Sequence, residues 1–253
     1  MELPPAWQRP DPLRGLDKVA WSELDHGHGV DVLLRASAEG DLEALAALEG
    51  RLLDDDTVSE ASFHAVPFLV ELAANYKVPG AARDRVVFLL AAMALAGAGF
   101  TDDGKRTRRH WNPLRRELPR LPPDWITQTR YAVAKGAPKV FDALAGAEVA
   151  CALALAIAVP EVVPKHVVDV AQGIAFAGTH PQLLVEAACA ALHLLLDEGT
   201  DDTWAYAIAQ GDPEELARYE SGAYPAHQPP AVTAQLMGFR YAFRAAYGRP
   251  ARP

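Results

Sequence analysis

The stretch Val66-Pro67-Phe68-Leu69-Val70-Glu71-Leu72-Ala73 places a proline directly before an apolar run with one carboxylate near its end. Residues 137–145 (Ala-Pro-Lys-Val-Phe-Asp-Ala-Leu-Ala) and 163–171 (Val-Pro-Lys-His-Val-Val-Asp-Val-Ala) repeat this pattern imperfectly. Proline is well tolerated in the first turn of a helix, where its missing N–H has no intrahelical partner to lose. Each copy therefore predicts the start of a helix, and their recurrence is typical of stacked helical pairs.

The chain has 253 residues, of which 50% are hydrophobic and 23% charged, which is ordinary for a globular protein. We expect one helical domain over residues 16–248, preceded by a proline-rich extended arm (1–15) and followed by a short tail (249–253). The uncharged apolar runs 86–100 and 149–159 are too short to span a bilayer and predict buried helices. The first residues lack a basic region followed by an apolar core, so no secretory signal is expected and a cytoplasmic location is predicted.

The apolar spacing predicts helices along most of the chain. Leu45, Leu48 and Leu52 fall on one face of a helix that Asp41 is placed to cap. Thr57 and Glu60 have the spacing of a capping box, which predicts a helix from about residue 58 that bends or restarts at Pro67. The expected helices are 16–24, 30–38, 42–53, 58 onward, 82–96, 125–134, 138–144, 148–159, 162–177, 179–196, two short helices after residue 201, and 231–247. The last of these is expected to cap the open end of the helical stack.

Residues 97–124 interrupt this pattern with a basic, proline-rich insertion. Connections of this length are uncommon in compact domains and tend to be functional or disordered. One interpretation is a solvated loop, and the other is a binding segment. The binding interpretation selects a tryptophan and the arginines around it: Arg106, Arg108, Arg109, Trp111 and Arg115.

The formal net charge of −9 is unevenly distributed. Residues 39–60 and residues 197–220 each hold eight acidic residues and one basic residue, whereas residues 102–120 hold seven basic residues and three acidic ones. The overall acidity argues against a surface built mainly to bind phosphates. The acidic stretches are suited to a basic partner protein.

Few residues point to chemistry. Asp25, His26 and His28 offer metal ligands, but no second ligand group stands at a recognisable spacing, and a hydrogen-bonded loop is the alternative. Residues 54–56 (Asp-Asp-Asp) lack the glycine and terminal glutamate of a calcium loop. The two cysteines, Cys151 and Cys189, lie in apolar helical runs and are expected to be buried. No metal, cofactor or catalytic residue is predicted from these patterns.

Aromatic residues gather in the last quarter of the chain. Trp204 and Tyr206 follow Asp201 and Asp202, and Tyr219, Tyr224 and His227 come shortly after. These side chains either line a pocket or belong to the core or cap of the helical stack. Trp204 and Tyr206 are accordingly included among the predicted binding residues.

Several of these features together resemble a known group. The run Trp21-Ser-Glu-Leu24-Asp-His26-Gly-His-Gly29, then Asp31-Val-Leu-Leu34, Gly40-Asp41, Thr57-Val58 and Ala65-Val-Pro-Phe-Leu69, resembles the N-terminal half of bacterial HEAT-like repeat proteins of the actinobacterial type. The resemblance covers residues 19–95 and, more diffusely, reaches about residue 196. It implies an all-α, right-handed α-solenoid of HEAT-like helical pairs that serves as a binding scaffold, and it carries over no catalytic residue.

Two classes of function follow. The first is a non-catalytic scaffold that binds a basic protein, for example as an immunity protein, an antitoxin or a regulatory partner. The alternative is a nucleic-acid-binding module or a DNA glycosylase-type enzyme that uses Trp111, Trp125 and the arginines of the insertion. The repeat architecture above all, together with the net charge and the absence of an active-site motif, favours the scaffold, and no membrane association is expected.

Overall fold

The computed structural model describes residues 11–54, 57–75, 77–96, 124–144, 149–177, 182–196, 202–224 and 230–248, without the side chains of residues 202–204. Every regular element in these ranges is a helix and none is a strand, which confirms the all-α class. The chain divides into two compact units. The first unit comprises Met1–Ala96 and Trp125–Glu148, and the second comprises Gly97–Asp124 and Val149–Pro253.

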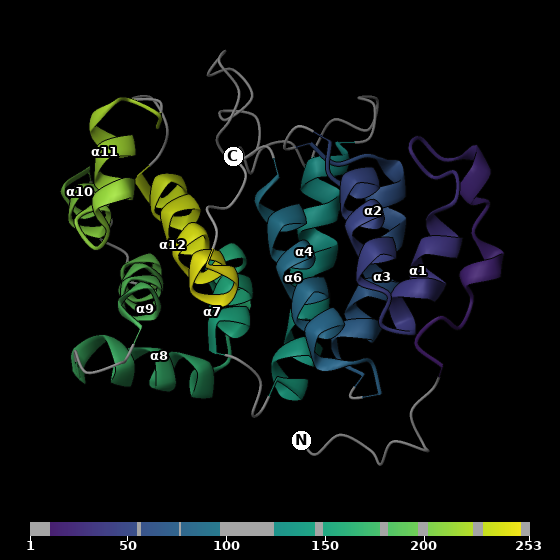
Figure 1. Cartoon of the computed structure of the whole chain (residues 1–253), viewed down its shortest axis with the longest axis horizontal. Coiled ribbons are helices and arrows are strands. Elements are labelled where there is room, and N and C mark those ends of the chain that lie inside the picture. Colours follow the sequence, from purple (N-terminus) through teal and green to yellow (C-terminus); the bar gives the residue numbers. More distant parts are fainter. Residues whose placement is uncertain are drawn as a thin grey trace, which may run out of the picture. The chain divides into compact units, whose positions relative to one another are not determined.

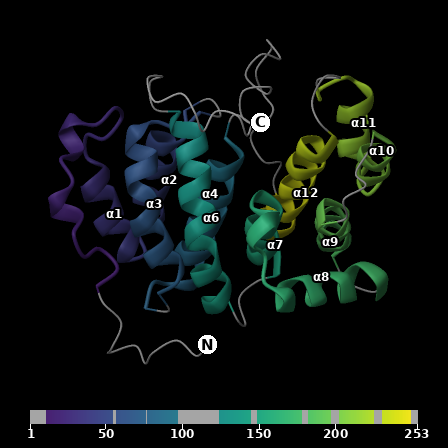
Figure 2. The same cartoon turned by 180° about the vertical axis from the view of Figure 1, so that it is seen from behind.

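The first unit is a set of α-helices preceded by two short 3₁₀ helices, where one helix over 16–24 was predicted. Its elements are η2 (Leu16–Lys18), η3 (Trp21–Glu23), α1 (Val30–Ala38), α2 (Leu42–Leu52), α3 (Glu60–Ala73), α4 (Gly80–Leu95) and α6 (Trp125–Ala143). Figures 1 and 2 show α1 to α4 and α6 side by side. The helix α1 packs on α2 and α3, and α4 packs on α2 and α3, so the hairpin α1–α2 stacks on the hairpin α3–α4.

The apolar faces predicted for these helices form the core of the first unit. Leu45, Leu48 and Leu52 are all buried, as their spacing indicates. The helix α6 covers both α3 and α4. A Cβ atom at Gly136 of α6 would lie 2.5 Å from Cγ2 of Val70 in α3, so glycine permits this close approach of the two helices.

Short polar side chains stand at the starts of α2 and α3. The carboxylate of Asp41 accepts hydrogen bonds from the N–H groups of Glu43 and Ala44 at 2.9 and 3.0 Å, which confirms the predicted cap. The capping box expected at Thr57 and Glu60 is wrong. Ser59 precedes α3 instead, and its N–H donates to Oγ of Ser62 at 3.0 Å. The hydroxyl of Thr57 donates to the carbonyl of Asp54, so it serves a tight turn before the helix.

Two of the three prolines predicted to start helices lie inside them. Pro67 is within α3 and Pro138 is within α6, so residues 125–143 form one helix rather than the two expected. Both prolines are exposed, and at each of them the carbonyl four residues earlier loses its helical donor. Pro164 does mark a start, because its carbonyl accepts from the N–H of Val167 at 3.0 Å as α8 begins.

The second unit is built around its last helix. Its elements are α7 (Val149–Ala158), η5 (Pro160–Val162), α8 (Lys165–Ala177), α9 (Leu183–Leu196), α10 (Asp202–Ala209), α11 (Pro213–Glu220) and α12 (Pro230–Tyr247). The helix α12 packs against α7, α9 and α10, as Figure 1 shows. The expectation that this helix caps the end of a stack is corrected, because it fills the centre of the second unit.

Glycine again permits a close helix contact in this unit. A Cβ atom at Gly238 of α12 would lie 2.8 Å from Cβ of Ala191 in α9 and 3.0 Å from Cδ1 of Ile157 in α7. The amide of Gln235 donates to the carbonyl of Ile157 at 3.1 Å, which joins α12 to the end of α7. Cys151 and Cys189 are buried in this core, as predicted. None of the described helices is both long and apolar enough to cross a membrane.

Candidate functional site

The structure describes only part of the predicted binding set. Arg106, Arg108, Arg109, Trp111 and Arg115, with the whole interval 97–123, lie outside the described residues. Trp204 belongs to α10, but its side chain is not described. Tyr206 is therefore the one predicted binding residue whose side chain can be placed.

Tyr206 begins a row of three tyrosine rings on the second unit. Its ring centroid lies 5.9 Å from that of Tyr219 in α11, and the ring of Tyr219 lies 6.4 Å from that of Tyr224, just beyond α11. Tyr206 is 42% exposed, whereas Tyr224 is buried. This tyrosine row (Tyr206, Tyr219 and Tyr224) thus runs from the surface to the interior, and it unites residues that the sequence offered as separate possibilities.

The inner end of the row meets a buried ion pair. The hydroxyl of Tyr224 donates to Oε1 of Glu215, and Nε of Arg240 donates to Oε2 of the same carboxylate at 2.9 Å. The Glu215 side chain is fully buried and the Arg240 side chain is 4% exposed. A pair in this setting holds α11 against α12, because removing either member leaves a buried charge without its partner.

The start of α11 makes a second ion pair with α12. Pro213 occupies the first turn, and Oδ1 of Asp212 accepts from the N–H of Glu214 at 2.9 Å, an N-cap arrangement. The other oxygen of Asp212 accepts from Nη1 of Arg244 at 2.7 Å. Nη2 of Arg244 lies 3.2 Å from Oε2 of Glu214. Arg244 is therefore matched by two carboxylates.

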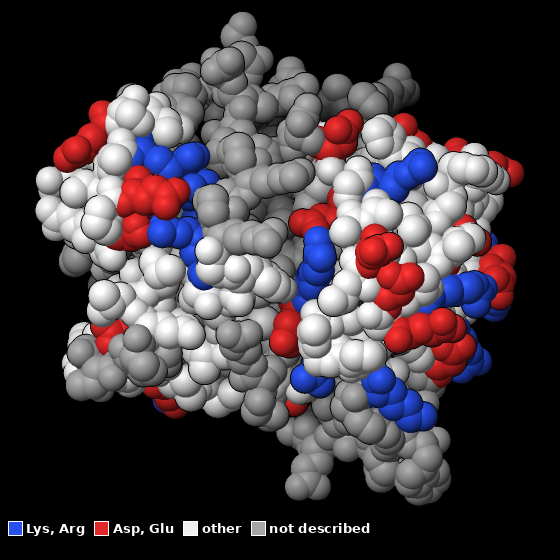
Figure 3. Space-filling model, viewed as in Figure 1, with Lys and Arg blue, Asp and Glu red and all other residues white. Residues whose placement is uncertain are grey.

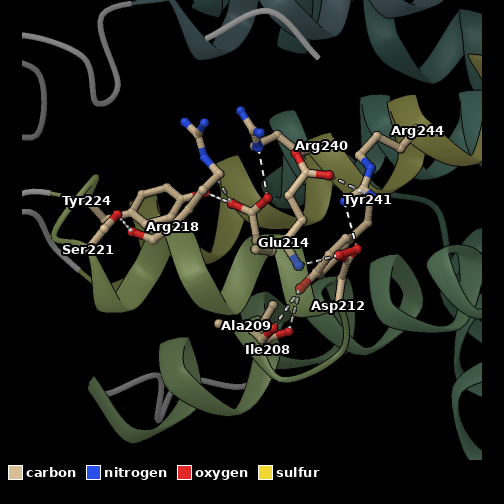
Figure 4. A network of polar contacts seen from close by, with 11 residues as sticks. Ile208, Ala209, Asp212, Glu214, Arg218, Ser221, Tyr224, Arg240, Tyr241 and Arg244 are labelled. Carbon is tan, nitrogen blue, oxygen red and sulfur yellow. Dashed lines mark hydrogen bonds and ion pairs between the residues drawn. The ribbon is translucent and has the colours of Figure 1, made fainter. Parts of the chain in front are cut away.

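Tyr241 joins α12 to the end of α10. Its hydroxyl donates to the carbonyl of Ile208 at 2.7 Å, as Figure 4 shows. Burial raises the pKa of the Tyr241 hydroxyl well above its ordinary value, and the nearby carboxylates of Glu215 and Asp212 add to the effect. Burial also raises the pKa of the Glu215 carboxyl, whereas the positive charges of Arg240, Arg218 and Arg244 act in the opposite direction.

These contacts change the interpretation of the acidic stretch at 197–220. Of its eight acidic residues, Asp212, Glu214 and Glu215 pair with arginines of the chain itself. Sequence reasoning missed this pairing because charges were counted along the chain and the arginines come from a helix more than twenty residues later. The available signal was Arg240 and Arg244, four residues apart and therefore on one face of an otherwise uncharged helix.

The metal ligands considered at the start of the chain do not assemble into a site in the described part. His26 Nε2 lies 3.6 Å from Oδ1 of Asp25, and both side chains are exposed. Within the described ranges, no three His, Cys, Asp or Glu side chains stand together as a metal site would require.

Comparison with protein families, with curated proteins and with solved structures finds no match to this chain.

Proposed function

We propose that the chain is a cytoplasmic, non-catalytic scaffold of HEAT-like helical pairs that binds a basic protein. An immunity protein, an antitoxin or a regulatory partner is the kind of role this implies. The packing of α1 on α3 and of α2 on α4 supports the repeat architecture, since successive pairs in a solenoid stack first helix on first helix and second on second.

The observation that carries the proposal is the tyrosine row. Tyrosine supplies a large, rigid contact area with a polar tip and is enriched where proteins bind one another. Tyr206 presents its ring at the surface, the ring of Tyr219 packs against it, and the ring of Tyr224 packs against that of Tyr219. Because the hydroxyl of Tyr224 is hydrogen-bonded to buried Glu215, the inner end of the row is held in place without a partner.

Charge indicates which kind of partner would fit. Glu220 is exposed and follows Tyr219 directly on α11. A lysine or arginine of a partner can lie over the Tyr206 ring, where the negative face of the ring attracts a cation, while its charge is met by a carboxylate. On the first unit, Glu39 and Glu43 are also exposed, and Figure 3 shows acidic and basic residues interspersed there.

The proposal is tested by affinity purification from native lysate with three forms of the full chain. Tyr206→Ala removes the exposed end of the row. Tyr131→Ala is the matched control, because Tyr131 is 68% exposed on α6 of the first unit. We expect one predominant basic protein to copurify with the wild type and with Tyr131→Ala, and to be lost with Tyr206→Ala. Equal recovery by all three forms, or recovery of background alone, would count against the proposal.

The nucleic-acid alternative depends on Arg106, Arg108, Arg109, Trp111 and Arg115, which lie outside the described residues. It stays a prediction with its own test. Binding to DNA or RNA that is sensitive to salt and is weakened by Arg108→Ala with Arg109→Ala would support it, and no binding at about 50 mM salt would eliminate it.

A further inference from the structure

Arg218 of α11 and Arg240 of α12 share one buried carboxylate, that of Glu215. Nε of Arg240 donates to Oε2 of Glu215 at 2.9 Å, and Nε of Arg218 lies 4.0 Å from Oε1. Both guanidinium groups therefore flank the same buried group. In Figure 4 their outer ends extend to the same side, away from the Asp212 end of the network.

Each of these arginines has a buried donor atom without a hydrogen-bond partner. The atoms are Nη1 of Arg240 and Nε of Arg218. The Arg240 side chain is only 4% exposed, so its unpaired donor is not compensated by bulk water. A buried donor without an acceptor destabilises the fold, and the cost is greater when the donor carries a charge. A ligand that accepts from these atoms recovers that cost.

The local charge has the sign that an anion needs. Among the described side chains, Arg244 is matched by Asp212 and Glu214, whereas Arg218 and Arg240 share the single carboxylate of Glu215. Within the described residues, these two arginines therefore carry one more positive charge than the carboxylate between them balances. The Arg218 side chain is 30% exposed, so it offers a route from solvent to the buried donors.

We propose that a small oxyanion, the carboxylate or phosphate group of a ligand, binds between Arg218 and Arg240 and accepts from their unpaired donors. The planar guanidinium presents its N–H groups in a fixed fork that matches the oxygens of either group. The negative charge of the ligand neutralises the part of the positive charge of Arg218 and Arg240 that Glu215 does not balance. This site is separate from the exposed face of Tyr206 and does not depend on a protein partner.

The test is a titration of the purified full chain with inorganic phosphate and, separately, with acetate, at ionic strength held constant with sodium chloride. The readout is the ¹H–¹⁵N resonance of Nε in Arg240, together with the midpoint of thermal unfolding. We expect a saturable shift of the resonance and a rise in the midpoint with at least one of the two anions. Whichever anion binds more tightly identifies the phosphate or the carboxylate as the preferred group.

Three variants show whether the named atoms hold the ligand. Arg218→Gln is expected to weaken binding at least about 10-fold, because a hydrogen bond to a charged group contributes about 1.5–3 kcal/mol. Arg218→Lys keeps the charge but loses the fork, and is also expected to bind more weakly. Arg51→Gln, at an exposed arginine of α2, is the control and should bind as the wild type does. Circular dichroism verifies that each variant is folded.

Two results would overturn the proposal. One is the absence of a saturable change with both anions in the wild type. The other is unchanged affinity in folded Arg218→Gln, which would place any bound anion elsewhere. Neither result bears on capture of a basic protein by the tyrosine row, which Tyr206→Ala tests.

Discussion

Replacing Glu215 with alanine should destabilise the second unit strongly. The Glu215 side chain is fully buried, and its carboxylate is the acceptor for Nε of Arg240, whose side chain is 4% exposed. Removing one partner of a buried ion pair leaves an uncompensated charge and typically costs about 3–5 kcal/mol. The hydroxyl of Tyr224 loses its acceptor at the same time, which acts in the same direction.

The neighbouring residue supplies a matched control. Glu214 precedes Glu215 on α11 and also pairs with an arginine of α12, at 3.2 Å from Nη2 of Arg244, but its side chain is 49% exposed. Exposed pairs contribute about 0–1 kcal/mol because water screens them. Glu214→Ala should therefore reduce the free energy of unfolding by less than about 1 kcal/mol. The difference between the two alanine variants measures the effect of burial.

A double variant shows whether the stability lost in Glu215→Ala comes from the unpaired charge of Arg240 or from lost packing. Glu215→Leu combined with Arg240→Met replaces both charges with apolar side chains of similar size. Such replacements are often neutral or stabilising, so most of the stability lost in Glu215→Ala should return. If the double variant is as unstable as Glu215→Ala, the loss comes from packing and not from the unpaired charge.

Urea unfolding followed by circular dichroism gives the free energy of unfolding of each variant. Hydrogen exchange shows which helices lose stability. We expect Glu215→Ala to lose protection in peptides from α10, α11 and α12, and Glu214→Ala to retain it. The reasoning would be refuted if both alanine variants showed the same small loss of stability, since Arg240 would then be hydrated without Glu215.

Three further predictions concern the second unit. Gly238→Ala should lower the free energy of unfolding by about 1–3 kcal/mol, because the new Cβ would lie 2.8 Å from Cβ of Ala191. A Cβ atom added at Gly173 of α8 would meet nothing within 4 Å, so Gly173→Ala should instead raise the free energy of unfolding by about 0.5–1 kcal/mol. Urea unfolding of both variants checks that the two changes in the free energy of unfolding have opposite signs. Burial raises the pKa of Cys189 to about 12, so the native chain should resist iodoacetamide at this residue until urea is added, as measured by mass spectrometry. Labelling at equal rates with and without urea would contradict this. Burial also raises the pKa of Tyr241, so the folded chain keeps this proton to higher pH than the unfolded chain does. The contribution of the Tyr241 hydroxyl to the free energy of unfolding should fall as the pH rises above the ordinary tyrosine pKa of about 10. Tyr241→Phe should lack this pH-dependent loss of stability in urea titrations at pH 8 to 11.

Local patterns were sufficient for much of the secondary structure. The helix at 30–38 was predicted with the ends that α1 has, and the Asp41 cap and the buried face of α2 were also correct. These features depend on residues within one or two turns of each other, and a periodic apolar face has only one side to bury. The prolines show the limit of local reasoning. Pro67 and Pro138 were expected at helix starts, yet burial of the residues around them keeps α3 and α6 continuous.

What the sequence alone determined, then, is that the chain is helical, where most of its helices run and which faces they bury. Only the tertiary structure decided that α12 is a central helix rather than a cap, because its position depends on contacts with α7, α9 and α10. The same packing places three acidic residues of the stretch 197–220 in ion pairs with Arg240 and Arg244, namely Asp212, Glu214 and Glu215. It also brings Tyr206, Tyr219 and Tyr224 into one row. Charge and aromatic groups act through space, so their meaning depends on which helices pack together.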